Sequence, residues 1–143
     1  MATMERAEAI AFLTAGTRTG KLATASRSGA VSVAPVWFVL DDATNEAVFT
    51  TGATTLKGRH LTENPRAALT VDVSEFPYHF VVVRGTVSVQ ENPSDMVAWA
   101  TRIAARYVPE GQAAAYGRRN GVPGELLCRL RLERVRGERE IAL

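Results

Sequence analysis

Short apolar or alternating segments along the chain predict a protein built mainly of β-strands. Residues 21–26 and 31–40 flank Arg27-Ser28-Gly29-Ala30, which is typical of a hairpin turn. Further strands are predicted over residues 47–49, 67–73, 80–89 and 126–133. In the last of these, apolar residues occupy alternate positions from Leu126 to Leu132. We therefore expect a strand with one buried and one mostly solvated face, and Cys128 on the buried face.

Helices are predicted in four segments of the chain. Residues 3–15 place Ile10 and Leu13 on one face of a helix that Gly16 would end. Residues 56–63 predict a short helix closed by Asn64-Pro65, and residues 112–118 predict another. Asn92-Pro93 has the form of a helix start, with asparagine as N-cap. The helix after it carries an apolar stripe, typical of a core or a dimer interface: Met96, Trp99, Ala100, Ile103 and Tyr107.

The order of these elements indicates the fold class. Antiparallel strands with short connections and few helices favour a small closed or nearly closed barrel over a parallel, doubly wound sheet. A chain of 143 residues is long enough for one hydrophobic core but not for two. We therefore expect a mainly β (α+β) protein with a single domain over residues 1–143.

Two strands contain residues that interrupt a regular ladder. Pro35 cannot donate a ladder hydrogen bond, so it indicates an edge or a bulge. The backbone from Ser32 to Val36 would then be free to meet a flat ligand with a polar rim; an ordinary core strand with one irregularity is the alternative. Both faces of residues 31–40 are largely apolar, which predicts a strand covered on both sides. Gly85 marks a bulge, a bend or a close backbone approach in its strand.

A segment rich in threonine predicts an anion site. After the strand at residues 47–49, Thr50-Thr51-Gly52-Ala53-Thr54-Thr55 leads into the helix 56–63, with Thr54 or Thr55 as N-cap. Lys57 lies in the first helical turn, where a cation opposes the helix dipole and a bound anion would offset it. A solvated lysine is the alternative. Neither a G-x-x-x-x-G-K-[ST] loop nor a G-x-G-x-x-G fingerprint is present, so a P-loop or Rossmann domain is not supported.

Composition and charge exclude several classes of function. A net charge of +2 does not suggest a nucleic-acid or membrane partner. One cysteine allows no disulfide within the chain, and two histidines leave little for a zinc or iron centre. The first residues do not resemble a signal peptide, and no apolar run approaches the ~20 residues of a membrane span. We expect a cytoplasmic protein without a metal site.

Side-chain catalysis has no motif to support it. The chain lacks G-x-S-x-G, H-E-x-x-H and a Cys/His pair, and Asp41-Asp42 is better explained as a solvated turn than as paired catalytic carboxylates. Phe76, Tyr78 and His79 surround a proline in a turn, either as exposed interaction residues or as a turn over the core. No catalytic residue is identified. An enzyme of this kind would use a bound cofactor for its chemistry.

A series of motifs in fixed order resembles the pyridoxamine 5′-phosphate oxidase-like split-barrel superfamily. The resemblance covers residues 22–132. Its motifs are Ser32-Val33-Ala34-Pro35-Val36-Trp37-Phe38, Thr50-Thr51-Gly52, Lys57-Gly58-Arg59-His60-Leu61, Asn64-Pro65-Arg66, Pro77-Tyr78 and Arg84-Gly85-Thr86. Within the superfamily, the lysine-bearing turn is similar to that of the flavin/deazaflavin oxidoreductases that use coenzyme F420. Arg129-Leu130-Arg131-Leu132 lacks the histidine of the Arg-x-His element of true pyridoxamine phosphate oxidases, so the resemblance does not imply vitamin B6 oxidation.

The resemblance implies an FMN-binding-like split β-barrel of about six antiparallel strands with peripheral helices, assembled as a homodimer with the cofactor at the subunit interface. It implies that Ser32, Val33, Ala34, Pro35 and Val36 run along the deazaflavin ring. Thr50, Thr51, Thr55, Lys57 and Arg59 would hold the phosphate-bearing tail, and Tyr78 with His79 would reach in from the partner subunit.

The implied reaction is hydride transfer from reduced F420 to an unsaturated small-molecule acceptor that resembles biliverdin, a quinone or an enone. Two alternatives are open. The first is an FMN-dependent oxidoreductase of the same fold, and the second is a non-catalytic flavin- or heme-binding carrier.

Overall fold

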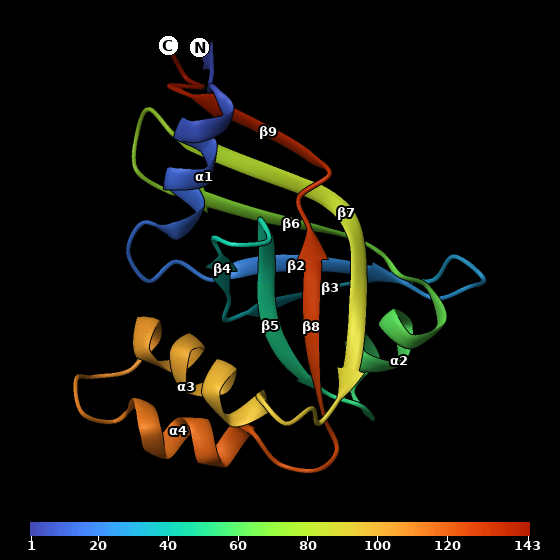
Figure 1. The fold of residues 1–143 in the computed structure, drawn as a ribbon. Coiled ribbons are helices and arrows are strands. Elements are labelled where there is room, and N and C mark those ends of the chain that lie inside the picture. The colour runs from blue at the N-terminus through green and yellow to red at the C-terminus, as the bar shows by residue number, and fades with distance from the viewer.

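A computed structural model describes the whole chain, residues 1–143, as one strongly curved antiparallel sheet with four helices around it (Figure 1). Seven strands follow the spatial order β3-β2-β6-β7-β8-β5-β4, while β9 pairs with β1 and β7. The strands are β1 Ala2–Thr3, β2 Gly20–Ala25, β3 Val31–Val36, β4 Val39–Asp41, β5 Glu46–Gly52, β6 Arg66–Val73, β7 His79–Glu91, β8 Glu125–Arg131 and β9 Arg134–Arg139. This arrangement confirms the predicted split-barrel fold class.

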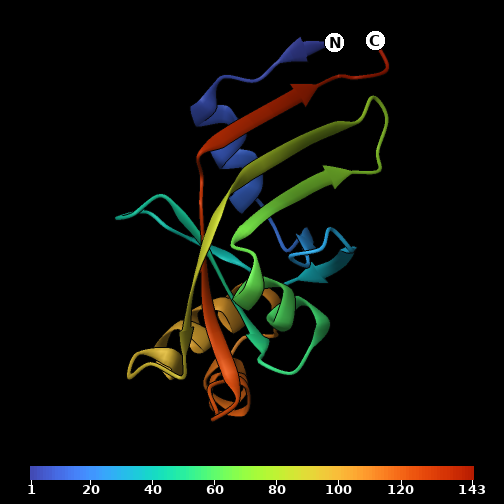
Figure 2. The same cartoon turned by 90° about the vertical axis from the view of Figure 1, so that its right-hand side faces the viewer.

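The longest strand, β7, joins the two halves of the barrel. Residues 80–84 of β7 pair with β9, and residues 87–91 pair with β8. The change of partner occurs around Gly85, where a Cβ atom would collide with the carbonyl oxygen of Arg131. The bend and close approach expected at Gly85 are therefore confirmed, and Figure 2 shows β7 turning sharply between its two partners.

The helices cover different parts of the barrel. Helix α1 (Arg6–Thr14) lies near β9 and β7, while α3 (Met96–Tyr107) and α4 (Ala113–Asn120) lie side by side at the opposite end (Figure 1). Helix α2 (Leu56–Glu63) follows β5 directly. Buried side chains of the strands and α1 form the main core, and Val48, Met96, Ile103 and Leu127 form a second cluster under α3.

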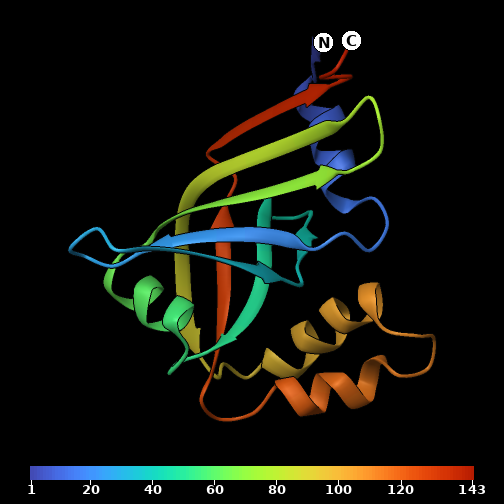
Figure 3. The ribbon, with the colours of Figure 1, turned by 180° about the vertical axis from the view of Figure 1, so that it is seen from behind.

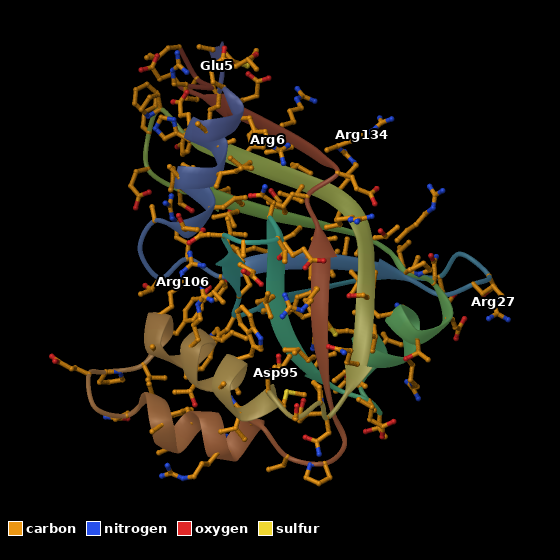
Figure 4. All side chains as sticks on the ribbon, in the orientation of Figure 1. Glu5, Arg6, Arg27, Asp95, Arg106 and Arg134 are labelled. Carbon is orange, nitrogen blue, oxygen red and sulfur yellow. The ribbon has the colours of Figure 1, made fainter.

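Arg106 and Tyr107 at the end of α3 hold the helix to the barrel. The Arg106 guanidinium donates to the carbonyl oxygens of Leu13, Gly16 and Phe38 at 2.8, 2.9 and 2.7 Å. Figure 4 shows Arg106 at the end of α3 that faces α1. The Tyr107 ring stacks on Trp37, with centroids 5.2 Å apart, and its hydroxyl accepts from the N–H of Phe38 at 3.2 Å. Burial raises the pKa of Tyr107, so the hydroxyl keeps its proton.

Several sequence predictions need correction. The strand predicted over residues 31–40 is two strands, β3 and β4, because Trp37 and Phe38 between them are not part of a strand. β3 is not covered on both sides, since Val31 and Val33 are 79% and 68% exposed. Leu127, assigned to a mostly solvated face, is fully buried under α3.

The helix boundaries also differ from the predictions. Residues 2–3 form β1, and α1 begins only at Arg6. Asn92 does not cap α3: the helix begins four residues later, with Asp95 at its N-cap position, and Asn92 itself has a positive φ of 38°. β9 was not predicted, because its sequence is rich in arginine and glutamate rather than apolar residues.

Candidate functional site

The first candidate site is a cavity of about 300 Å³, here called the lysine cavity, between the end of β5, the start of α2 and the helices α3 and α4. Uncharged residues form most of its wall, and Lys57 and Glu125 are its two charged residues. The full lining is Pro35, Val36, Trp37, Thr50, Thr51, Gly52, Thr55, Lys57, Ala100, Ile103, Asn120 and Glu125.

Thr55 organises the local structure of this cavity. It is the N-cap of α2, and its hydroxyl accepts from the N–H of Gly58 at 3.1 Å. The same hydroxyl lies 2.8 Å from the carbonyl oxygen of Gly52 and 3.0 Å from the hydroxyl of Thr51. A Cβ at Gly58 would collide with the Gly52 carbonyl oxygen. The sequence from Thr51 to Gly58 therefore folds α2 directly against the end of β5, which settles the choice between Thr54 and Thr55 as N-cap.

The charges of the lysine cavity fit a phosphate group. The N–H groups of Leu56 and Lys57 make no hydrogen bond within the protein, as expected for the first turn of a helix, and the helix dipole is positive at this end. The partly buried side chain of Lys57 adds a positive charge, and three threonine hydroxyls line the same wall. These are the groups that bind phosphate in proteins.

Glu125 belongs to this cavity, although no motif or spacing in the chain points to it. Its backbone pairs with Gly52, and an Oε1 atom lies 4.0 Å from the position that a Cβ at Gly52 would take. Burial raises the pKa of the Glu125 carboxyl, and the charge of Lys57 acts in the opposite direction. No atom of its carboxylate comes within ion-pair distance of Lys57. Trp37 and Asn120 are further lining residues that the predicted site did not include.

Arg59 lies apart from Lys57 in this chain. It is exposed and lines a separate depression of about 370 Å³ together with Arg27, Thr62 and Glu63. The two cations expected to share one phosphate therefore border different hollows. Within one subunit, Lys57 is the cation of the lysine cavity.

Strand β3 presents a free backbone edge. It pairs only with β2, which confirms that Pro35 lies on an edge strand. In the turn between β2 and β3, the N–H of Ser26 donates to the carbonyl oxygen of Ala30, so these two residues form a hydrogen-bonded pair. Hydrogen-bonded pairs alternate along an antiparallel ladder, so residues 32, 34 and 36 point their backbone groups toward β2. The free groups therefore belong to Val31, Val33 and Pro35. Ser32, Ala34 and Val36 use their backbone groups within the sheet.

The outer face of the sheet is apolar and open beside this edge. A hollow of about 620 Å³, here called the sheet-face hollow, runs over β3, β2, β6 and β7, and Ser32 is part of its lining. Val31 and Val33 stand out from it, and Figure 3 shows no helix across the outer face of β2 and β3. Arginines border the hollow at the β8–β9 corner, where Figure 4 labels Arg134.

Tyr78 and His79 lie in a fourth hollow, of about 780 Å³, that also includes Lys21, Val33 and Asp72. The end of the chain holds this loop: the N–H of Glu140 donates to His79 Nδ1 at 3.0 Å, and the N–H of Ile141 donates to the carbonyl oxygen of Tyr78 at 3.0 Å. Tyr78 is 42% exposed, so the loop is not simply folded over the core.

The predicted site residues therefore form one group and several separate ones. Pro35, Val36, Thr50, Thr51, Thr55 and Lys57 meet in the lysine cavity. Ser32, Val33, Arg59, Tyr78 and His79 line other hollows, and Ala34 lines none of these. Val33 lines both the sheet-face hollow and the Tyr78–His79 hollow, and Pro35 and Val36 line the lysine cavity. Strand β3 therefore borders three of the four hollows.

Cys128 and His60, two further side chains with reactive groups, are buried in the fold. Burial raises the pKa of the Cys128 thiol to about 12, which confirms an inert core thiol. His60 is buried, with its Nδ1 atom 2.9 Å from the Thr24 hydroxyl. No group of three or more His, Cys, Asp or Glu side chains is arranged to hold a metal ion.

The family follows from a sequence comparison. The family model described as pyridoxamine 5′-phosphate oxidase matches residues 7–138, which is nearly the whole chain. The chain belongs to this family. No protein of curated function matches it by sequence. No helix of this family member is long and apolar enough to cross a membrane.

Solved structures with the same fold include three that span nearly equal lengths. A conserved hypothetical protein from Mycobacterium tuberculosis is 20% identical, with a TM-score of 0.78, over 98% of this chain and 89% of that one. An F420 reductase is 24% identical, with a TM-score of 0.66, over 87% and 94%. A FAD-binding protein from Mesorhizobium loti is 21% identical, with a TM-score of 0.67, over 95% of both chains. At these identities the likeness shows a common fold.

Proposed function

We propose that this family member is a deazaflavin-dependent oxidoreductase that passes a hydride from reduced coenzyme F420 to an unsaturated acceptor such as a biliverdin-, quinone- or enone-like molecule. The observation that carries the proposal is the lysine cavity, where Lys57, three threonines and the start of α2 surround a space suited to a phosphate group. The F420 reductase of the same fold supports the choice of cofactor.

The residues present fit the cofactor in two respects. Lys57, the hydroxyl of Thr50 and the free N–H groups at the start of α2 would hold the phosphate of its tail, while Thr51 and Thr55, whose hydroxyl protons are used within the turn, would shape this place. The free edge of β3 at Val33 and Pro35 would offer backbone groups to the ring. The deazaflavin itself supplies the hydride chemistry. The protein's part is to orient the ring, hold the acceptor against it and exclude water.

The proposal includes a homodimer. Ser32, Val33, Tyr78 and His79 lie outside the lysine cavity, so a single chain does not gather the ring-binding part of the site that the family resemblance implies. The sheet-face hollow exposes Val31 and Val33 beside the small residues Ala23 and Ala67, an apolar surface that a second copy would cover. Light scattering after size-exclusion chromatography should give twice the chain mass. The Val33→Lys variant should give the mass of a single chain. A wild-type protein with the mass of one chain would contradict the dimer.

A titration of the purified protein with F420 and, separately, with FMN tests the proposed cofactor. Trp37 lines the lysine cavity and is held by Tyr107, so its fluorescence should report binding there. We expect saturable quenching by F420 at lower concentration than by FMN, and a Trp99→Phe variant removes the background of the other tryptophan. Tighter binding of FMN would contradict F420 dependence. Binding without turnover against a panel of acceptors would indicate a carrier.

FMN is the second candidate cofactor. The FAD-binding protein of Mesorhizobium loti shares the fold over 95% of both chains, so a flavin suits this architecture as well. An FMN-dependent enzyme would retain yellow flavin through purification, whereas an F420-dependent enzyme made in a host without F420 would be colourless.

A further inference from the structure

Glu125 is a carboxylate in a cavity that otherwise suits an anion. It enters from the start of β8, opposite Gly52, and shares the cavity wall with Lys57 and Asn120. It makes no hydrogen bond or ion pair through its side chain. In the same strand, the Arg129 guanidinium forms ion pairs with Asp41 and Glu46. A partly buried, unpaired carboxylate beside a predicted phosphate site calls for an explanation other than stability.

Apart from Lys57, no side chain that lines the lysine cavity has a positive charge that would neutralise Glu125. β5 contributes Thr50, Thr51 and Gly52, and α3 contributes Ala100 and Ile103. β3 and α4 contribute only uncharged residues, and Cys128, nearby on β8, has a pKa of about 12 and stays neutral. With Lys57 and Glu125 both ionised, the side chains lining the cavity have a net charge of zero.

We propose that Glu125 sets the charge of the phosphate group that the lysine cavity accepts, favouring a phosphodiester over a phosphate monoester. This inference rests on the proposed function, because it takes the phosphate-bearing cofactor tail as the ligand. A phosphodiester has one negative charge. A monoester, whose second pKa is about 6, has nearly two at pH 8. Coenzyme F420 contains its phosphate as a diester and FMN as a monoester.

The physical reason is Coulombic. The repulsion between an ionised Glu125 and the phosphate group in the cavity is proportional to the charge on that group, so the monoester loses twice as much binding free energy as the diester. Uptake of a proton by Glu125 would relieve that repulsion. The burial that already raises the pKa of its carboxyl makes this uptake easier than for an exposed glutamate.

The test compares dissociation constants of F420 and FMN at pH 8 in the wild type, Glu125→Gln and Glu110→Gln. Glu110 is an exposed carboxylate between α3 and α4, so Glu110→Gln matches the change in net charge away from the cavity. For Glu125→Gln we expect FMN to bind about tenfold tighter and F420 about threefold tighter. The smaller factor is the square root of the larger, because the diester phosphate has one negative charge and the monoester has two. Glu110→Gln should change neither constant by more than about 1.5-fold at 0.15 M salt.

A second measurement reads the carboxyl group directly. The 13C NMR signal of the Glu125 side chain, assigned by its loss in Glu125→Gln, should titrate at higher pH when FMN is bound than when F420 is bound. Equal gains for both cofactors, no gain, weaker binding in Glu125→Gln or an unmoved titration would overturn the role of Glu125. Failure of the wild type to bind either cofactor would instead overturn the proposed function, and this inference with it.

Discussion

Glu125 and Arg129 are charged residues on one face of β8, and their surroundings are opposite. Arg129 donates to Asp41 at 2.9 Å and to Glu46 at 3.4 Å, and its guanidinium lies 4.7 Å from the centre of the Trp99 ring. Glu125, four residues earlier, makes no ion pair, and Lys57 is the one other charged residue that lines its cavity. The two positions share a strand and a face.

The difference is between a charge that is paired within the chain and one that is not. The ion pairs of Arg129 lower the pKa of Asp41, because the guanidinium stabilises the carboxylate. Burial raises the pKa of Glu125, because nothing in the chain stabilises its ionised form strongly enough. A perturbed carboxyl in a cavity is a candidate for a functional site. In the function proposed above, the end of β8 near Glu125 belongs to the binding site, whereas the ion pairs of Arg129 support the fold.

Arg129→Met should have the largest effect on stability. It removes the ion pairs of the partly buried carboxylates of Asp41 and Glu46 and leaves Asp41 only the hydrogen bond from the N–H of Ala43, a loss of about 2–4 kcal/mol of unfolding free energy. Urea unfolding at pH 7 measures this. Arg131→Met, an exposed arginine of the same strand, is the control and should change stability by less than about 0.5 kcal/mol. A loss of F420 affinity in a folded Arg129→Met would break the distinction between the two ends.

Lys57→Ala should have the largest effect on binding. It removes the one cation of the lysine cavity, so F420 affinity should fall by about 1.5–3 kcal/mol, the scale of a lost hydrogen bond to a charged group. Arg59→Ala is the matched comparison from the same helix and should cost less than about 0.5 kcal/mol, since Arg59 borders another hollow. Unchanged affinity in Lys57→Ala would remove Lys57 from the site.

Thr55→Ala should reduce both stability and binding moderately. It deletes the N-cap of α2 and the hydroxyl bonds to Gly52 and Thr51, a loss of about 1 kcal/mol of unfolding free energy. Thr54→Ala is the control, because Thr54 is exposed and its side chain makes no hydrogen bond. Thermal unfolding of both variants checks this, and equal effects would contradict the assignment of Thr55 as N-cap.

Asp41→Asn and Glu125→Gln should change the pH dependence of stability in opposite directions. The lowered pKa of Asp41 contributes stability above its ordinary pKa of 3.8, which is lost as the pH falls through the lower value of the folded state. The raised pKa of Glu125 contributes stability below its ordinary pKa of 4.5, which is lost as the pH rises through the folded value.

At pH 8, Asp41→Asn should therefore lower Tm and Glu125→Gln should raise it, the latter by less than about 3 °C. Both differences from the wild type should shrink as the pH falls below these ordinary values. Scanning calorimetry from pH 3 to pH 8 would show this. A Glu125→Gln protein that is less stable than the wild type at pH 8 would mean that the carboxylate stabilises the fold.

The sequence by itself determined the elements whose signals are local. Thr55 and Gly58 specify the turn from β5 into α2 through hydrogen bonds within a few residues, and Pro35 identified the edge strand because it has no N–H to donate. The order of short strands likewise predicted a small antiparallel barrel rather than a parallel, doubly wound sheet. The mainly polar β9 was missed, since its place depends on pairing with β7 rather than on an apolar pattern.

Only the tertiary structure decided which residues share a site. It placed Glu125 opposite Gly52 across a β-ladder between residues more than 70 positions apart, and it separated Lys57 from Arg59 although they are neighbours on one short helix. It also buried Leu127 and exposed Val33, contrary to their strand patterns. Long-range pairing and the packing of α3 set these relations, and no local pattern in the chain encodes them.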